Sequence, residues 1–404
     1  MVFRIVFASV LLHVAFASLR FAASLDALAH GASSLEVGVI VSLMALGPTF
    51  TAVAFGRYID RVGTRLPIVI GALMLGTAAI TGVLFPVADH ALWPLYGIAL
   101  VGGLGFLFIT LVSQKTVGFI STAAARQTSF AWLAMGMSAS GLLSPILTGT
   151  LIDHAGFAAV FLTASGFAAA GLLMFAVSFT KLPATLGAVQ PTAQKNSSWD
   201  LLKVPALRNV LIVSALVSMA WDLQHYMFPV YGHAVGLSAT EIGWLTGIFY
   251  SATFLVRFLM PWTSKHFTEW QFLVLTLAVG GAAYAVFPLF TTFGPLTVAA
   301  FILGLGLGSS QPNVMSLLHS EAPAGRVGEA LGVRTMFTNG CHTVLSTTFG
   351  ILTGVFGAAS IFIAMATILL TAARASRVSH RHTPDERESE KLFPDFLRLI
   401  DLKT

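Results

Sequence analysis

Ionisable side chains interrupt several long apolar stretches of this sequence. His13 and Arg20 are seven residues apart in the first stretch, Asp222 and His225 are three apart in another, and Arg334 lies in a later one. If these stretches are helices, each pair lies on one helix face. A buried carboxylate must find a partner or take up a proton. Asp222 is therefore the leading candidate for a proton-binding group. We expect Arg20 to hold either Asp222 or an anionic substrate, with a static ion pair between helices as the alternative, and the buried arginines favour an anionic ligand.

Purely structural roles compete with function at some of these positions. His13 is compatible with a hydrogen-bonded packing residue, and Arg334 with an ion pair or a gate near the inner end of its helix. Asp26 and Arg257 lie near expected helix ends, where we expect their charges to reach the membrane interface. Asp222 is the hardest of these residues to explain by packing, because a charge inside a membrane is costly.

The composition indicates that most of the chain lies in a lipid bilayer. Of its 404 residues, 56% are hydrophobic and only 10% are charged, whereas soluble domains carry roughly 25% charged residues. Lipid cannot satisfy backbone polar groups, so the spans must be helices or a closed barrel. The apolar runs last about 20 residues, which suits helices. The net charge of +5 comes from basic residues spread over short loops, which argues against a nucleic-acid partner.

These runs predict an all-α membrane protein with twelve transmembrane helices in two pseudo-symmetric halves. The N-terminal half covers residues 1–180, a polar linker covers 181–207, the second half covers 208–376, and a charged tail covers 377–404. The expected helices lie near residues 3–26, 36–56, 67–87, 92–113, 127–151, 158–180, 208–231, 238–260, 270–290, 295–317, 330–353 and 357–376. The single cysteine, Cys341, falls inside a span and excludes an internal disulfide.

Basic residues set the expected orientation. With the N-terminus inside, the expected outer loops contain no Lys or Arg, and the inner loops, linker and tail hold them. This bias places both termini in the cytoplasm. The first run imitates a signal peptide, since Arg4 precedes it and Ala15-Phe16-Ala17 resembles a cleavage site. We expect it to be retained, because its flanking sequence recurs in the second half.

The two halves resemble each other at a nearly constant offset. Residues 31–38 match 236–243 at an offset of 205, residues 103–105 match 306–308 at 203, and residues 156–161 match 357–362 at 201. Two such halves suit a binding site at the membrane midplane between them. Arg20 and His225 are equivalent at the 205 offset, so we expect them to face each other at similar depth.

A motif between the second and third helices resembles the signature of the major facilitator superfamily. Residues 56–67 read Gly-Arg-Tyr-Ile-Asp-Arg-Val-Gly-Thr-Arg-Leu-Pro. Gly56 is expected to allow close helix approach, Gly63 a tight turn, and Arg61 and Arg65 contact with anionic headgroups. The resemblance implies a conformational latch between the halves, with Asp60 near a helix N-terminus.

Two weaker signals lie in the fifth and tenth helices. Gly141, Ser144, Pro145 and Gly149 resemble a Gly-rich run of efflux-type members, although Ser144 replaces the expected Gly; generic small-residue packing is the alternative. In the tenth helix, Pro312 permits a bend. Its neighbours Gln311 and Asn313 join the expected cavity, with His13, Arg20, Asp222, His225 and Arg334.

We expect a secondary transporter of a small organic molecule in a bacterial inner membrane, with proton-coupled export as the first reading. Proton-coupled import of an organic anion is the alternative, and a receptor or scaffold is disfavoured because the tail and linker leave little room for an added domain. Motifs for ATP binding, hydrolases and metal sites are missing, so we predict no enzyme, no cofactor and no metal. The expected partners are the substrate, protons and lipid, around a monomer.

Overall fold

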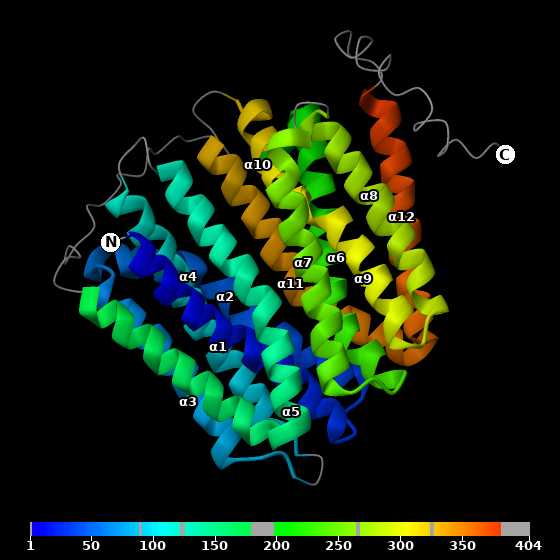
Figure 1. The fold of residues 1–404 in the computed structure, drawn as a ribbon. Coiled ribbons are helices and arrows are strands. Elements are labelled where there is room, and N and C mark those ends of the chain that lie inside the picture. Colours follow the sequence, from blue (N-terminus) through cyan, green and yellow to red (C-terminus); the bar gives the residue numbers. More distant parts are fainter. Residues whose placement is uncertain are drawn as a thin grey trace.

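The computed structural model describes residues 2–88, 91–121, 126–178, 198–263, 267–323 and 327–380. Within these ranges every regular element is helical and there are no strands (Figure 1). The first half contains α1 (Val2–Ala29), α2 (Ser34–Val62), α3 (Arg65–Leu84), α4 (Trp93–Ile120) and α5 (Arg126–Ser178). The second half contains α6 (Pro205–Ala234), α7 (Ala239–Thr263), α8 (Glu269–Val286), α9 (Phe293–Gly308), α10 (Ser310–Glu321), α11 (Val327–Phe356) and α12 (Ala358–His380). The short helices η2 (Ser198–Lys203) and η3 (Phe287–Leu289) precede α6 and α9.

These elements account for the twelve expected crossings. Two spans share α5, which turns at Gly156, where φ is 78°. One span is divided into α9 and α10 at Ser309, three residues before Pro312. In the described part of the chain, ten helical stretches are long and apolar enough to cross a membrane when α5 counts once, and α11 holds a shorter apolar run at Gly340–Phe356. The prediction of an all-α membrane fold is therefore confirmed.

The boundaries of the linker and tail differ from the expected ones. Most of the linker, residues 181–197, and the tail from 381 onward lie outside the described residues. Residues 198–203 form η2, and α6 begins at Pro205 rather than at 208. Helix α12 continues to His380, four residues beyond the expected end.

The internal repeat reappears in the backbone. Gly31 and Gly236 have φ of 79° and 81°, and Gly156 and Gly357 have φ of 78° and 80°. This left-handed region is accessible to glycine at little cost, so each half turns its chain with the same residue at the same place. The helices that follow Gly31 and Gly236 also begin alike: Ser33 and Glu36 form a capping box, and the backbone N–H groups of Ser238 and Glu241 donate to each other's side chains.

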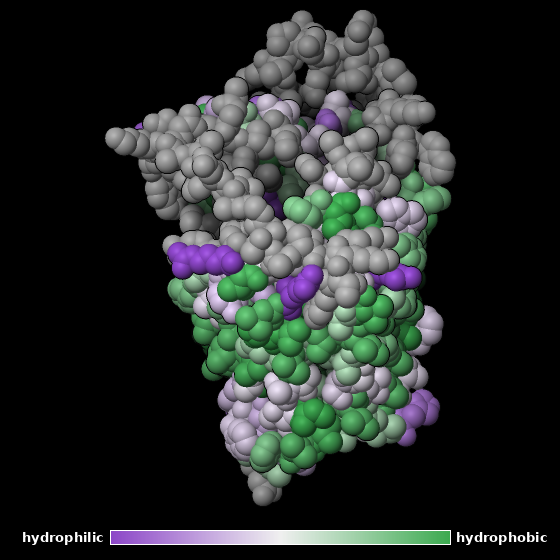
Figure 2. Space-filling view, turned by 90° about the vertical axis from the view of Figure 1, so that its left-hand side faces the viewer, coloured by the Kyte–Doolittle hydropathy of each residue, from purple (hydrophilic) through white to green (hydrophobic). Residues whose placement is uncertain are grey.

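The two halves pack side by side, with an apolar outer surface. Helix α1 is buried along most of its length because α4 and α5 cover it, and α6 occupies the equivalent place in the second half. Contacts between the halves are made mainly by α5 with α7 and by α2 with α11. Figure 2 shows a broad apolar belt on one face, with strongly hydrophilic side chains gathered along its upper edge. We call the end at which α1 begins and α12 ends the terminal end, and the opposite end the far end.

Candidate functional site

A large cavity of about 1170 Å³ lies between the two halves. Its walls come from α1, α4 and α5 on one side and from α6, α7, α10 and α11 on the other. The lining residues lie in the first part of α1 and α6 and the last part of α4 and α7, so the cavity occupies the terminal half of the bundle. We call it the wide cavity.

Close backbone contacts seal the far end. A Cβ added at Gly350 of α11 would stand 2.7 Å from the Ser34 carbonyl oxygen, and one at Gly38 of α2 would stand 2.5 Å from the Ser346 carbonyl oxygen. Helices α5 and α7 form the second contact of this kind. A Cβ at Gly149 of α5 or at Gly243 of α7 would collide with the backbone of the opposite helix. Missing side chains thus allow the halves to touch directly, and the protein is closed at the far end.

Polar contacts reinforce the same seal. The Asp153 carboxylate, at the far end of the first half, accepts hydrogen bonds from the backbone N–H groups of Ala239 (3.2 Å) and Thr240 (2.7 Å) at the start of α7. The Tyr226 hydroxyl of α6 donates to the Ser34 carbonyl oxygen at 2.8 Å. A carboxylate beside a helix N-terminus satisfies free N–H groups and complements the helix dipole. These bonds must break if the far end opens.

Asp222 pairs with a residue that sequence reasoning missed. Its side chain is 4% exposed, and one carboxylate oxygen contacts Nδ1 of His342 from α11. We expected Arg20 as the partner; the ion pair is instead made with His342 of α11, although Arg20 of α1 remains within electrostatic range of Asp222. The same rule that selected His13, an imidazole in an apolar span, could have found His342. The His342 ring lines the wide cavity, whereas Asp222 lies behind it.

Asp222 and His225 point to different neighbours, although they are three residues apart on α6. The His225 imidazole Nε2 is 2.8 Å from the Tyr250 hydroxyl of α7. On the opposite wall, Nδ1 of His13 contacts the Ser140 hydroxyl of α5. His13 and His225 are therefore both held by hydrogen bonds while they face the wide cavity.

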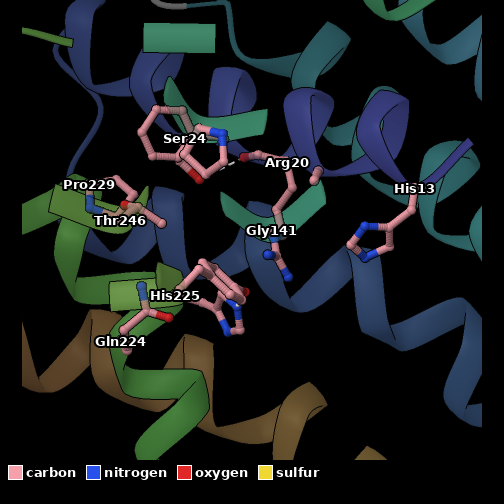
Figure 3. Close-up of a pocket in the computed structure, with 12 residues that line it drawn as sticks. His13, Arg20, Ser24, Gly141, Gln224, His225, Pro229 and Thr246 are labelled. Carbon is pink, nitrogen blue, oxygen red and sulfur yellow. Dashed lines mark hydrogen bonds between the residues drawn. The ribbon is translucent and has the colours of Figure 1, made fainter. Parts of the chain in front are cut away.

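A smaller cavity adjoins the wide one on its far side. This end pocket has a volume of about 30 Å³, and its walls include Arg20, Gln224, His225 and Thr246. Figure 3 shows the Arg20 side chain extending from α1 toward the His225 ring of α6. The repeat-related residues Arg20 and His225 thus line one pocket, which is where the sequence placed them relative to each other.

Two more arginines line the wide cavity. Arg334 of α11 donates from Nε to the Ser214 hydroxyl at 2.9 Å. Arg257 donates to the Gly308 carbonyl oxygen at 3.0 Å and to the Ser138 hydroxyl of the other half at 2.8 Å. The expectation that Arg257 reaches the membrane interface was therefore wrong: its helix directs it inward. Among the described residues that line the two cavities, there are three arginines and no Asp or Glu.

The tenth-helix residues divide between two environments. Gln311 is exposed to the wide cavity, and its side-chain oxygen accepts a 3.4 Å hydrogen bond from Arg257. Asn313 is 4% exposed and donates from its amide to the Ser309 carbonyl oxygen at 2.7 Å. Asn313 lines neither of the two cavities, so its place in the site stays a prediction. Ser309 is the N-cap residue of α10, so this bond ties the Asn313 side chain to the start of its own helix.

The fifth-helix residues meet α7. A Cβ at Gly141 would stand 2.7 Å from the Tyr250 ring, and the Pro145 backbone lies against Gly243. Gly149 approaches the start of α7, and Ser144 is fully buried. The small residues of this run therefore lie at or beside the contact between the halves.

The latch motif is described only in part. Gly63 has φ of 80° and ends α2, Arg61 is exposed, and Arg65 begins α3. The side chain of Asp60 lies outside the described residues. A Cβ at Gly56 would meet no described atom within 4 Å, so the described residues show no close helix approach at this position.

Comparisons with known proteins agree with this architecture. The family model described as Major Facilitator Superfamily matches residues 5–340 and 210–399. The chain is 27% identical over 342 residues to the uncharacterized MFS-type transporter YhjO of Bacillus subtilis (strain 168), covering 83% of this chain and 81% of that protein. It is 23% identical to a protein named multi-drug resistance efflux pump PmrA homolog of Lactococcus lactis subsp. lactis (strain IL1403), with 76% of each chain covered.

Solved structures share the fold at low sequence identity. A peptide transporter POT in complex with sulfate superposes with a TM-score of 0.74 at 15% identity, over 93% of both chains. A variant of the nucleoside transporter NupG gives a TM-score of 0.76 at 14% identity, over 94% of this chain and 99% of that one. With the family match covering most of the sequence, the twelve-helix protein described here belongs to the major facilitator superfamily, whose members are transporters and not enzymes.

Proposed function

We propose that this chain couples the movement of protons to the export of a small organic molecule across a bacterial inner membrane. A cavity in one half of the bundle, with the two halves sealed against each other at the opposite end, supports alternating access between the two halves. The distribution of Lys and Arg supports cytoplasmic termini, so the wide cavity would face the cytoplasm. The similarity to a protein named as an efflux pump supports export.

The observation that carries proton coupling is the contact between Asp222 and His342. Asp222 is buried, and its second carboxylate oxygen has no hydrogen-bond partner among the described residues. A carboxylate in this setting must share a proton or a positive charge. The His342 ring both lines the wide cavity and contacts Asp222, and it belongs to α11, which also forms the seal with α2. Both residues belong to the second half, so a rotation of the halves would carry the pair from one face of the membrane to the other and change which side exchanges protons with Asp222.

Coupling requires that proton and substrate occupancy depend on each other. His342, His225 and His13 all line the wide cavity, so a substrate there would contact the groups that exchange protons. The alternative direction, import of an organic anion with protons, uses the same residues. The two directions differ in the sign of the proton gradient that drives accumulation.

The test compares two buried carboxylates that each pair with a histidine. Asp26 of α1 is 3% exposed and contacts His30, one turn along the same helix, at 3.0 Å. It does not reach the membrane interface as expected, because α1 is covered on all sides there. Since the Asp26 pair links no two helices and lines neither cavity, Asp26→Asn is the matched control for Asp222→Asn.

Purified protein is placed in proteoliposomes with an imposed pH gradient of either sign and a mixture of labelled organic acids, amines and neutral aromatics. We expect wild type and Asp26→Asn to accumulate a compound against its gradient. Asp222→Asn should lose accumulation and keep exchange of the same compound. Gradient-driven accumulation by folded Asp222→Asn with wild-type pH dependence would overturn the coupling role.

A further inference from the structure

The end pocket is shaped for a small polar group at the tip of a larger ligand. His13, His225 and Tyr250 line both the end pocket and the wide cavity, so the two spaces are continuous. A water molecule needs roughly 10–15 Å³ of such volume, and the pocket offers about 30 Å³. It therefore has room for about two oxygen-sized atoms, and the rest of a ligand must lie in the wide cavity.

Arg20 supplies a positive charge to this pocket, and Asp222 lies within its electrostatic range but forms its ion pair elsewhere. Its guanidinium makes no ion pair among the described residues, and its closest described ring contact is with Phe16, at 6.0 Å from the ring centroid. Asp222, the buried carboxylate of the neighbouring helix, is held by His342. A guanidinium presents parallel N–H donors that match the two oxygens of a carboxylate. The charge and the geometry both suit a small planar oxyanion.

Gln224 provides a second, independent sign of a missing ligand. The residue is 1% exposed, and both its amide nitrogen and its amide oxygen are buried without a hydrogen-bond partner among the described residues. Leaving such a group unsatisfied costs stability, and native proteins rarely do so without a reason. Gln224 lines the end pocket from α6, and Arg20 enters the same pocket from α1, with the His225 side chain between them in the view of Figure 3. An oxyanion in that space would accept hydrogen bonds from both side chains.

The wide cavity next to the end pocket has aromatic walls on both sides. In the first half, Phe106 stacks on Phe16 with ring centroids 4.0 Å apart. In the second half, Trp221 lies 6.0 Å from Tyr250 between ring centroids. Phe106, Trp221 and Tyr250 all line the wide cavity. These walls suit a flat apolar or aromatic body.

We propose that the end pocket binds the carboxylate head of an amphiphilic organic anion, with Arg20 and Gln224 as its ligands and the apolar body between Phe106 and Trp221. This inference rests on the proposed transport function and specifies its substrate class. The described lining of both cavities contains no acidic residue, which supports a negatively charged ligand.

The first test measures binding to purified full-length protein in lipid nanodiscs, without any gradient. The probes are naphthalene-2-carboxylate, its neutral carboxamide, and the cationic naphthalen-2-ylmethylammonium, which share one apolar body. Loss of one charged hydrogen-bonded contact corresponds to about tenfold or more in affinity. We therefore expect the carboxylate to bind at least about tenfold more tightly than the other two, and equal affinity for all three would overturn the proposal.

Two variants separate a ligand role from a structural one. Arg20→Gln should abolish the preference for the carboxylate, while Arg208→Gln, at the exposed start of α6 and outside both cavities, should keep it. Gln224→Met should weaken carboxylate binding and raise the unfolding temperature of the empty protein, because it removes an unsatisfied buried amide. Gln114→Met, an exposed position, should leave that temperature unchanged.

If Gln224 has a purely structural role, Gln224→Met should lower the unfolding temperature instead of raising it. A lowered unfolding temperature in Gln224→Met with unchanged carboxylate affinity would overturn its assignment, even if Arg20→Gln fails to fold. Because these measurements need no proton gradient, failure of coupling in Asp222→Asn and failure of anion binding at the end pocket are distinguishable.

Discussion

Gly350→Ala is expected to weaken the seal at the far end. The added Cβ would stand 2.7 Å from the Ser34 carbonyl oxygen and 2.9 Å from the Leu35 Cα, whereas ordinary contacts begin at 3.4 Å. Helices α2 and α11 must therefore separate by about 0.7 Å at this point. Overpacking of this kind costs about 1–3 kcal/mol. If the cost falls only on the sealed state, the equilibrium moves about 5- to 150-fold toward the open far end.

Gly354→Ala is the matched control. Gly354 lies one turn further along α11, and a Cβ there would meet no described atom within 4 Å. Both substitutions gain the same helix propensity, about 0.5–1 kcal/mol, from replacing glycine with alanine. The difference between the two variants therefore isolates the contact with α2.

A cysteine at the seal reports its opening. Ser42 of α2 is 7% exposed, and its hydroxyl accepts hydrogen bonds from the backbone N–H (3.0 Å) and hydroxyl (2.7 Å) of Thr347 on α11. In a Cys341→Ala background, which removes the only natural cysteine, the Ser42→Cys thiol should react with a maleimide only when α2 and α11 part. We expect Gly350→Ala to raise the labelling rate about 5- to 150-fold over Gly354→Ala. Equal rates in the two folded variants would refute the assignment of this contact as the seal.

Three further predictions address other contacts of the transport cycle. Asp153→Ala removes two hydrogen bonds to the start of α7. Because a helix cap contributes about 0.5–2 kcal/mol, this variant should also speed maleimide labelling of the Ser42→Cys thiol. An unchanged labelling rate would mean that the cap stabilises α7 and not the seal. Asp60→Asn and Gly56→Leu should slow transport while the protein still inserts into the membrane, as measured by flux per inserted molecule, and wild-type flux in both would remove the latch from the mechanism. Reporter fusions at residue 195 or 404 should be active only as cytoplasmic reporters, and periplasmic activity at either site would contradict the proposed orientation.

The site could be predicted from the sequence only in part. The rarity of charges in apolar runs was enough to select Arg20, His225 and Asp222, and the repeat offset correctly related Arg20 to His225 across the pocket. The same reasoning gave Asp222 the wrong partner, because the partner depends on how far α6 is rotated toward α11. Arg257 was assigned to the interface because position along a helix says nothing about which side the side chain takes.

The sequence by itself determined the number of membrane crossings and their approximate ends. Burying an apolar helix in lipid is favourable segment by segment, so composition along the chain is sufficient for this, and glycines such as Gly156 and Gly357 fix the turns locally. Only the tertiary structure decided which helices meet and which end is sealed. Those contacts depend on helix rotation and on close backbone approach between distant residues such as Gly350 and Ser34, and two arrangements of the halves can have nearly equal free energy. The unsatisfied amide of Gln224 is also a feature that only the tertiary structure reveals, because a missing hydrogen-bond partner can be recognised only when every neighbour is in place.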